Sequence, residues 1–476
     1  MLDTSPWAAR TTTALAPRWV GGLLALTDLL AVNFAITVAI LVRQNFAFLL
    51  EKPAQQDFEI MLLASVGILA VNFAIGLYPG YGLSEPERFR RQIAGVTLVF
   101  AMVAGWDYLL QHGLWSRMVS GLSFALALFL TVALGDLVRS RLRRAGRWGV
   151  PVAVLGIGES AARLVEVLRE RQAMGFIPTV VLSDEPDEQR TSIAGLPVLG
   201  PVASAHRLAP EIRHAFVAMP HLPPDRWSRM VERLGFAHVF LLPEITGRRS
   251  LSIQARDLQG TLAIELADNL LDRRKILIKR VLDFGIAALF ALLFLPLFLA
   301  LMALVKLTSR GPALFVQPRV GKDGRIFPAY KFRTMVVDAE ERLAEHLERN
   351  PQARAEYATF RKLRNDPRIT PVGAFLRRYS LDELPQFINV LKGEMSLVGP
   401  RCYLPEEVPD MNGSESLILR VLPGITGLWQ VSGRNRSTFA ERVEMDTYYI
   451  RNWSVSFDLY ILYRTIWAVL SGRDAY

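Results

Sequence analysis

Cysteine is almost missing from this chain of 476 residues. Because Cys402 is its one cysteine, the chain can form neither an intrachain disulfide nor a cysteine-based metal cluster. Histidine is also scarce: the C-terminal third holds only His346, in a charged helical stretch outside the blocks that carry motifs. Zinc chemistry and histidine-based acid–base catalysis are therefore not expected in that third. Carboxylates and arginines remain as the groups that could carry chemistry.

Acidic residues are outnumbered by basic ones. The chain has 55 Lys and Arg against 45 Asp and Glu, a formal net charge of +10 and a pI near 9.8. Such a charge suits nucleic acid, anionic lipid or a phosphorylated substrate. The apolar residues make up 51% of the chain and are concentrated in long runs. These runs favour membrane lipid as the partner, and we expect no nucleic acid.

Residues 1–145 are expected to form a transmembrane domain of four helices. Each of four apolar runs reaches or approaches the roughly 20 residues that a spanning helix needs. The first run is too long for the core of a signal peptide, so we interpret it as a retained anchor. The basic residues around the runs place both ends of the domain in the cytoplasm. The runs cover residues 20–42, 58–79, 92–111 and 118–138.

Three acids lie within or near these runs: Asp28, Asp107 and Asp136. An acid inside a membrane is by default a hypothesis for a functional site. The alternative is packing inside the bundle or placement at the interface. We favour the alternative because the sequence shows no basic residue among the three acids that could complete a relay.

Residues 146–270 are expected to form a cytoplasmic, Rossmann-like α/β domain. A β-branched segment at 150–155 runs into a glycine turn, and the following stretch has apolar residues at helical spacing. Strand-like segments at 180–184, 214–220 and 238–244 alternate with helical stretches. This alternation is typical of a parallel sheet.

The glycine turn of this domain has the pattern of a nucleotide-binding loop. Gly156, Gly158 and Ala161 form G-x-G-x-x-A between strand and helix, and Asp184 ends the next strand, where a ribose-binding acid would lie. The pattern is compatible with a bound nucleotide. We favour the alternative, in which the glycines only let the helix and the strand pack closely.

A further apolar stretch, at 281–306, is expected to enter the membrane without crossing it. As a straight helix, its apolar core would be about 33 Å long, enough to span the hydrocarbon core. However, basic residues flank it on both sides, so both flanks are expected in the cytoplasm. Pro296 lies near the middle, where it removes a backbone hydrogen bond and can bend the helix. We predict a re-entrant helix broken at Pro296, with a fifth spanning helix as the alternative.

The remainder of 271–476, expected to be mainly α-helical, contains an adjacent pair of carboxylates, Asp382 and Glu383. Ser380 and Glu383 match a helix capping box, but Pro385 would then fall inside the helix, where it is costly. If the helix instead begins near Asp382, its macrodipole favours the ionised carboxylate. Such a carboxylate suits a nucleophile or a magnesium ligand. Simple N-capping by Asp382 stays open on this local pattern.

Seven short blocks between residues 275 and 476 form an ordered set of motifs. The blocks are KRVLD at 279–283, YKFRTM at 330–335, DPRIT at 366–370, LRR at 376–378, LDELPQ at 381–386, MSLVGPR at 395–401 and PGITG at 423–427. Together they resemble the bacterial sugar transferase family, which comprises monotopic polyprenyl-phosphate hexose-1-phosphate transferases. The transmembrane helices and the Rossmann-like domain in front of them resemble the long form of that family.

This resemblance implies transfer of hexose 1-phosphate, galactose or glucose, from a UDP-hexose to undecaprenyl phosphate, with release of UMP. The reaction would take place at the cytoplasmic face of the bacterial inner membrane, as the first membrane step of exopolysaccharide, capsule or O-antigen synthesis. Asp382 would be the nucleophile that forms a phosphosugar-aspartyl intermediate. Glu383 would assist, and both carboxylates would bind Mg²⁺.

The resemblance also assigns basic residues. The phosphate contacts would be Lys331, Arg333, Arg377, Arg378 and Arg401, because guanidinium and ammonium groups suit phosphate. A structural or lipid-facing role is implied for Lys279, Arg280 and Asp283.

Cys402 departs from the family pattern, because the family usually has proline at this position. Loss of the proline frees a φ angle without removing the neighbouring arginine. Without a nearby histidine, we expect no reactive thiol. A homodimer is compatible with the sequence, but neither a heptad repeat nor an apolar patch marks an interface.

Two other hypotheses come from different classes. An NAD(P)-dependent oxidoreductase acting on sugar nucleotides would use Gly156 and Gly158, but the sequence shows no Tyr-x-x-x-Lys pair on a helix after the glycine turn. A non-catalytic scaffold for polysaccharide assembly would need no carboxylate chemistry at all.

Overall fold

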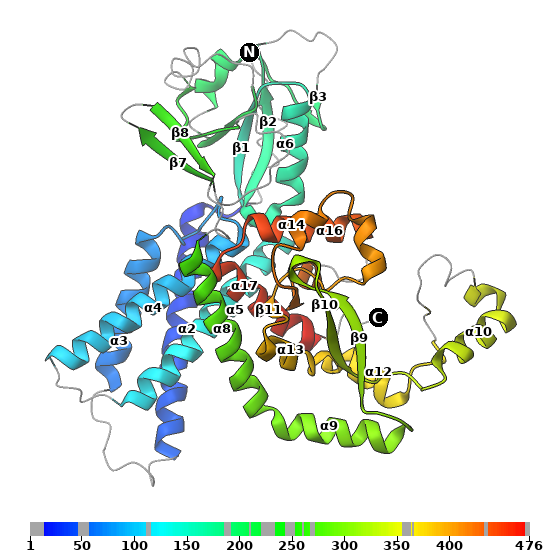
Figure 1. Ribbon diagram of the computed structural model, residues 1–476. Helices are drawn as coiled ribbons and strands as arrows, with labels where there is room; N and C mark the ends of the chain where they lie inside the picture. Colours follow the sequence, from blue (N-terminus) through cyan, green and yellow to red (C-terminus); the bar gives the residue numbers. More distant parts are fainter. Residues whose placement is uncertain are drawn as a thin grey trace. The chain divides into compact units, whose positions relative to one another are not determined.

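The computed structural model describes residues 14–45, 57–110, 116–184, 192–208, 211–219, 234–242, 253–258, 261–266, 272–354, 363, 366–432 and 437–471. The chain divides into two compact units, Met1–Thr246 and Gly247–Tyr476 (Figure 1). The first unit contains the N-terminal apolar helices and a parallel sheet. The second contains a bent pair of apolar helices and the motif blocks. The division into three domains at residues 145 and 270 stays a prediction.

The first unit begins with α2 (Pro17–Asn45), α3 (Asp57–Ala74), α4 (Glu85–Leu110) and α5 (Arg117–Arg144). Among the described helices, α2, α4 and α5 are each long and apolar enough to cross a membrane. The predicted second run extends to residue 79, but α3 ends at Ala74. Gly76 is left-handed, with φ of 72°, and its N–H donates to the carbonyl of Phe73. A fourth spanning helix therefore stays a prediction.

Asp28 lies inside this bundle with polar partners. The Tyr78 hydroxyl donates to its Oδ2 at 2.7 Å and the Asn72 amide at 2.9 Å. The expectation that no basic residue accompanies the acids is wrong: buried Arg139 has its Nη1 3.8 Å from Asp136 Oδ1 and lies within electrostatic range of Asp28. Residues far apart in the sequence meet here because α2, which carries Asp28, packs against both α3 and α5. These contacts support a packing role for Asp28.

The parallel sheet predicted for the middle segment is confirmed. Four strands lie in the order β2-β1-β5-β6, and each neighbouring pair is parallel. Helix α6 connects β1 to β2. The elements are β1 (Val150–Leu155), α6 (Glu159–Glu170), η2 (Gln172–Met174), β2 (Phe176–Leu182), β3 (Ser192–Ile193), β4 (Leu196–Pro197), η3 (Val202–Arg207), β5 (His214–Val217) and β6 (His238–Leu241).

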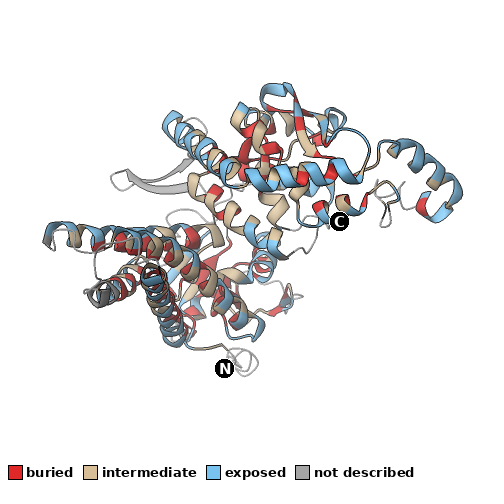
Figure 2. Ribbon diagram, turned by 90° about the horizontal axis from the view of Figure 1, so that it is seen from below, coloured by how far each residue is buried: buried red, intermediate tan, exposed pale blue. Residues whose placement is uncertain are grey.

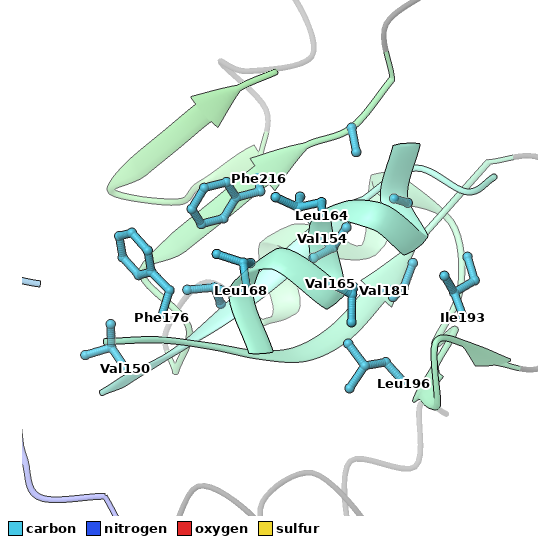
Figure 3. Close-up of a cluster of buried hydrophobic side chains, with 13 residues drawn as sticks. Val150, Val154, Leu164, Val165, Leu168, Phe176, Val181, Ile193, Leu196 and Phe216 are labelled. Atoms are coloured by element: carbon cyan, nitrogen blue, oxygen red, sulfur yellow. The ribbon is translucent and has the colours of Figure 1, made fainter. Parts of the chain in front are cut away.

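Helix α6 covers one face of this sheet. Its buried residues Leu164, Val165 and Leu168 follow helical spacing and pack against Val154 and Phe176 from the strands (Figure 3). Full burial of such side chains contributes about 1.5–3 kcal/mol each. The apolar pattern in the sequence therefore corresponds to a real core.

The second unit contains the bent apolar pair, α8 (Arg273–Leu293) and α9 (Leu295–Thr308), after the hairpin β7 (Ile253–Leu258) and β8 (Thr261–Leu266). The two helices are bent by 64° (Figure 1). The predicted break at Pro296 is displaced: α8 ends before Phe294, and Pro296 is in the first turn of α9, where its missing N–H costs little. Leucines such as Leu292 and Leu307 are 73% and 85% exposed. A bend with exposed leucines suits either a broken span or a re-entrant helix, and the latter stays a prediction.

The rest of the second unit is mainly helical, with an antiparallel hairpin of β9 and β10 and a short parallel pair of β11 and β12. Figure 2 marks the buried residues of these elements in red and the exposed ones in pale blue. The elements are β9 (Leu314–Val320), η5 (Lys322–Gly324), β10 (Ile326–Phe332), α10 (Ala339–Arg349), α12 (Pro371–Arg378), η6 (Leu381–Glu383), α13 (Gln386–Lys392), β11 (Ser396–Val398), η7 (Pro405–Met411), α14 (Glu415–Ile418), β12 (Gly424–Thr426), α15 (Leu428–Ser432), α16 (Phe439–Arg451) and α17 (Val455–Ser471).

A buried polar network attaches α8 to this unit. Lys279 donates from Nζ to Asp458 Oδ2 at 2.6 Å and to the carbonyl of Val398 at 2.9 Å. One turn later, Asp283 accepts from the Ser396 hydroxyl at 2.6 Å. Burial raises the pKa of Asp458, and the positive charge of Lys279 opposes this. Lys279 and Asp283 thus make structural contacts.

Candidate active site

Asp382 and Glu383 lie in the 3-10 turn η6, between α12 and α13. The helix predicted to begin near Asp382 starts there only as the 3-10 turn η6, from Leu381, and the α-helix α13 begins at Gln386. The capping box is also absent, because the Ser380 side chain makes no capping hydrogen bond and its backbone is left-handed with φ of 55°. A short 3-10 turn has no strong macrodipole, so the electrostatic state of Asp382 must come from its neighbours.

Helix α13 is bonded to strand β10, and α12 packs against Thr334, just after that strand. On α12, a Cβ at Gly373 would lie 2.0 Å from the carbonyl oxygen of Thr334, so only glycine allows this approach. On α13, the buried amide of Asn389 donates to the Pro328 carbonyl at 2.7 Å and accepts from the Tyr330 N–H at 3.1 Å. Sequence analysis missed Asn389, although a polar residue within the apolar stretch FINVL is a signal. These contacts hold η6 against β10.

The acid pair is matched by two basic residues. Lys331 Nζ lies 2.8 Å from Glu383 Oε1, and Arg377 is oriented by a 2.9 Å hydrogen bond from its Nε to Thr334 Oγ1. Burial and the negative charge of Glu383 raise the pKa of Asp382 to about 6, while Lys331 and Arg377 oppose the rise. Asp382 is therefore mostly ionised at neutral pH and less well solvated than a surface carboxylate.

Two of the five predicted phosphate contacts point elsewhere. Strand β10 ends at Phe332, so Arg333 lies just outside it. The guanidinium of Arg333 donates to the Ser309 carbonyl at 2.9 Å and to the Ser309 hydroxyl at 2.7 Å, at the C-terminus of α9. Arg378 is exposed and lies 5.8 Å from the ring centroid of Tyr379. Because neighbouring helical residues lie about 100° apart, Arg378 does not share the face of Arg377. Lys331 and Arg377 lie at the acids.

The loop at 399–404 carries Arg401 and packs against β12. Gly399 donates to the Thr426 carbonyl at 3.0 Å, and Gly424 donates to the Pro400 carbonyl at 2.8 Å. A Cβ at Gly424 would lie 2.1 Å from the Gly399 nitrogen. The glycines of the motif blocks therefore permit a close approach of two backbone segments.

Helix α16 fixes this loop through its buried residue Asp446. The Asp446 carboxylate accepts from the Arg401 N–H at 3.1 Å and from the Tyr403 hydroxyl at 2.8 Å. Burial raises the pKa of the Cys402 thiol, and the charges of Arg319 and Lys331 oppose the rise. A raised pKa disfavours the reactive thiolate. Cys402 also shows that the loop lies near Lys331 and hence near the acid pair.

The glycine turn of the parallel sheet has structural contacts. A Cβ at Gly156, where φ is 116°, would lie 2.7 Å from the Ala218 carbonyl oxygen, and Gly158 has φ of 90°. Asp184, the predicted ribose ligand, accepts from the Val202 N–H at 2.7 Å at the start of η3. These contacts favour the interpretation in which the glycines serve close packing.

In the described part of the chain, no group of three or more His, Cys, Asp and Glu side chains could hold a metal ion. The donor set at the site is the carboxylate pair in η6, with Glu383 already paired to Lys331. Mg²⁺ is commonly held by one or two carboxylates, with substrate phosphates and water as the other ligands. The pair therefore fits Mg²⁺ that arrives with a phosphorylated substrate.

Comparisons with known proteins show which proteins this chain resembles. The family description "Bacterial sugar transferase" matches residues 274–472, and "CoA-binding domain" matches residues 74–239. The UDP-galactose-lipid carrier transferase of Erwinia amylovora is 31% identical, over 95% of this chain and 97% of that protein. The undecaprenyl-phosphate galactose phosphotransferase of Salmonella typhimurium is 34% identical, over 76% of each chain.

A third relative carries a different sugar in its name. The UDP-glucose:undecaprenyl-phosphate glucose-1-phosphate transferase of Escherichia coli is 35% identical, over 68% of each chain. The identity extends through both units in the first of these relatives, and the apolar helices agree with an association with the membrane. The chain is a membrane-associated enzyme and belongs to the bacterial sugar transferase family.

Proposed function

We propose that this enzyme transfers hexose 1-phosphate from UDP-galactose or UDP-glucose to undecaprenyl phosphate and releases UMP. The observation that supports this most directly is the acid pair in η6, with Lys331 Nζ 2.8 Å from Glu383 and Arg377 near Asp382. The names of the relatives support both sugars and the lipid acceptor.

In the first step, a carboxylate oxygen of Asp382 attacks the β-phosphorus of the UDP-hexose. The bond from this phosphorus to the bridging oxygen breaks, and UMP leaves with the electron pair. Asp382 then carries hexose 1-phosphate as an acyl phosphate. With a pKa of about 6, Asp382 is ionised near neutral pH and poorly solvated, which suits a nucleophile. Lys331 and Arg377 can stabilise the charge that develops on the phosphoryl oxygens.

In the second step, a phosphate oxygen of undecaprenyl phosphate attacks the same phosphorus. The bond between phosphorus and Asp382 breaks, and the carboxylate is restored. Glu383, next to Asp382 and paired with Lys331, can accept a proton from the lipid phosphate. Two displacements replace one difficult transfer between two anions.

Asp382 and Glu383 would hold Mg²⁺ together with the diphosphate, and the ion would neutralise phosphate charge. We expect EDTA to abolish UMP release and added Mg²⁺ to restore it. Undiminished release in EDTA would reject the metal.

The bent pair α8 and α9 is proposed as a re-entrant insertion that leaves the active site in the cytoplasm. Its exposed leucines and the basic residues on both flanks support this. A cysteine at exposed Lys322, in a Cys402→Ala background, should resist a membrane-impermeant maleimide in intact cells and react after lysis. Labelling in cells with an intact inner membrane but a permeable outer membrane would contradict the topology.

The central test is a screen for UMP release from UDP-galactose, UDP-glucose and their N-acetyl forms. The variants are Asp382→Asn and, as a matched control, Asp410→Asn at an exposed site. We expect release with the wild type and the control, and none with Asp382→Asn. Without lipid acceptor, wild type given a UDP-hexose radiolabelled in the sugar should retain the label. Full activity of Asp382→Asn would reject this nucleophile, and a wild type inactive with every UDP-hexose would leave the scaffold hypothesis.

A further inference from the structure

Beyond the acid pair, three arginines gather beside the loop at 399–404, and two of them lie over Trp429, a residue of α15. We call Arg319, Arg401 and Arg442 the arginine cluster. The guanidinium carbons of Arg401 and Arg442 lie 5.5 Å and 5.0 Å from the Trp429 ring centroid. Arg319 belongs to β9 and donates from Nη1 to the Cys402 carbonyl at 3.0 Å. Strand β9, the loop at 399–404 and helix α16 thus each contribute one guanidinium.

The arginine cluster has more positive than negative charge. Glu407 is its acidic neighbour, 3.9 Å from Arg319 and 4.0 Å from Arg401. Asp446 is close to Arg401, but burial raises its pKa to about 7, so it offsets the excess only in part. Burial lowers the pKa of Arg319 and of Arg442, which shows that these cations are poorly solvated. A bound anion would relieve this imbalance.

The arginine cluster and Trp429 also contain buried hydrogen-bond donors that are unpaired among the described residues. The Nε atoms of Arg319 and Arg442 and the Nε1 atom of Trp429 are buried, and they make no hydrogen bond to any residue that the structure describes. Arg319 is only 7% exposed. Buried N–H groups without partners are destabilising, so such groups in a native structure call for an explanation. Phosphate oxygens would satisfy several guanidinium N–H groups at once.

The position of the arginine cluster separates it from the bent helices. In the β9–β10 hairpin, Lys331 pairs with Phe315, near the end that follows α9, whereas Arg319 pairs with Phe327. Four residues of strand place Arg319 about 13 Å further from α9 than Phe315. Figure 1 shows the hairpin leading from the region of α9 towards α14 and α16. Glu383 still acts electrostatically on Arg319, so the cluster adjoins the acid pair.

We propose that the arginine cluster binds the phosphate of the nucleotide half of the UDP-hexose and holds the departing UMP. This assignment rests on the proposed function. The phosphate of undecaprenyl phosphate remains at the membrane surface, at the α9 end of the hairpin. A water-soluble nucleotide reaches the far end, where the excess positive charge and the spare donors lie. Stabilising UMP as it leaves would assist the first displacement.

The test compares Arg442→Gln with Arg451→Gln, an exposed arginine on the same helix, in full-length protein reconstituted in lipid nanodiscs. Equilibrium dialysis with radiolabelled UMP measures affinity without turnover, and steady-state assays give KM for each substrate. Loss of one charge-assisted contact should weaken UMP binding about tenfold and raise KM for UDP-hexose similarly. KM for undecaprenyl phosphate should not change, and Arg451→Gln should match the wild type.

Two further variants separate recognition from folding. Arg442→Lys keeps the charge and should recover part of the UMP affinity, whereas Trp429→Phe loses one N–H and should weaken UMP binding. Unchanged UMP affinity in Arg442→Gln, or a rise in KM for undecaprenyl phosphate alone, would overturn the assignment. A wild type that binds UMP but releases none from any UDP-hexose would reject the proposed function. Loss of UMP binding in Arg442→Gln would still support the arginine cluster in that case.

Discussion

Replacing Lys331 with methionine tests whether the electrostatics of the acid pair control activity. Lys331 is 2.8 Å from Glu383 and lowers the pKa of Asp382, which burial and Glu383 raise to about 6. An opposite charge nearby shifts a carboxyl pKa by about 1–3, so its loss should raise the Asp382 pKa to about 7–9. At pH 7 the ionised fraction of Asp382 would fall from about nine tenths to between about one half and one hundredth.

The assay is the pH dependence of kcat/KM for UDP-hexose, measured by UMP release between about pH 5 and 9. A nucleophile must be ionised, so activity is lost as the pH falls through its pKa. For Lys331→Met this acidic limb should move to higher pH, and the activity lost at pH 7 should return in part at higher pH. Lys322→Met, an exposed lysine at the tip of the same hairpin, is the control and should keep the wild-type limb.

Glu383→Gln should move the Asp382 pKa in the opposite direction. It removes the negative charge that raises the Asp382 pKa and releases Lys331 from its ion pair, so the acidic limb should move to lower pH. The remaining activity is expected to be low, which requires a sensitive assay of radiolabelled UMP. An acidic limb that stays in place in both variants would refute the claim that Asp382 ionisation limits the reaction.

Further predictions concern stability and geometry. Asp382→Asn should raise the thermal midpoint at pH 8 while abolishing transfer, because it removes a carboxylate whose ionised form is disfavoured in the folded chain. The rise of the Asp382 pKa from 3.8 to about 6 corresponds to about 3 kcal/mol, which solvent screening reduces to about half. An unchanged or lower midpoint would contradict this. Lys279→Met leaves buried Asp458 without its cation and should destabilise the second unit by about 3–5 kcal/mol. The measurement is the loss of folded protein on size-exclusion chromatography. Adding Asp458→Asn to this variant should restore part of the lost stability. Gly424→Ala places a methyl 2.1 Å from the Gly399 nitrogen and so displaces the loop of Arg401. This variant should have a kcat/KM more than tenfold below that of the wild type. Wild-type activity would contradict the packing argument.

Much of the fold could be predicted because its signals are local. Apolar runs of membrane length and the alternation of strands and helices depend on residues close in sequence, and three long apolar helices and the parallel sheet are confirmed. The ends of individual helices were predicted less accurately. The end of α3 depends on the left-handed Gly76, and the bend at Phe294 depends on where proline is tolerated in a new helix.

The candidate site could be predicted only in part. Asp382, Glu383, Lys331 and Arg377 lie together as the motif blocks suggest. The sequence could not show that Arg333 reaches Ser309 instead, because the direction of a long side chain is decided by the contacts available around it. For the same reason, Arg139 among the membrane acids escaped notice.

By itself, the sequence determined the apolar helices and the carboxylate pair, since these depend on residue type and on spacing along the chain, and its motif blocks indicated the class of the enzyme through their resemblance to a family. Only the tertiary structure decided which charges meet. Glu383 and Lys331 are 52 positions apart, and their ion pair requires β10 to pack beside η6. The arginine cluster likewise needs three segments to meet: β9, the loop at 399–404 and α16. Electrostatic interaction falls with distance and grows with burial, and both quantities exist only in the folded chain.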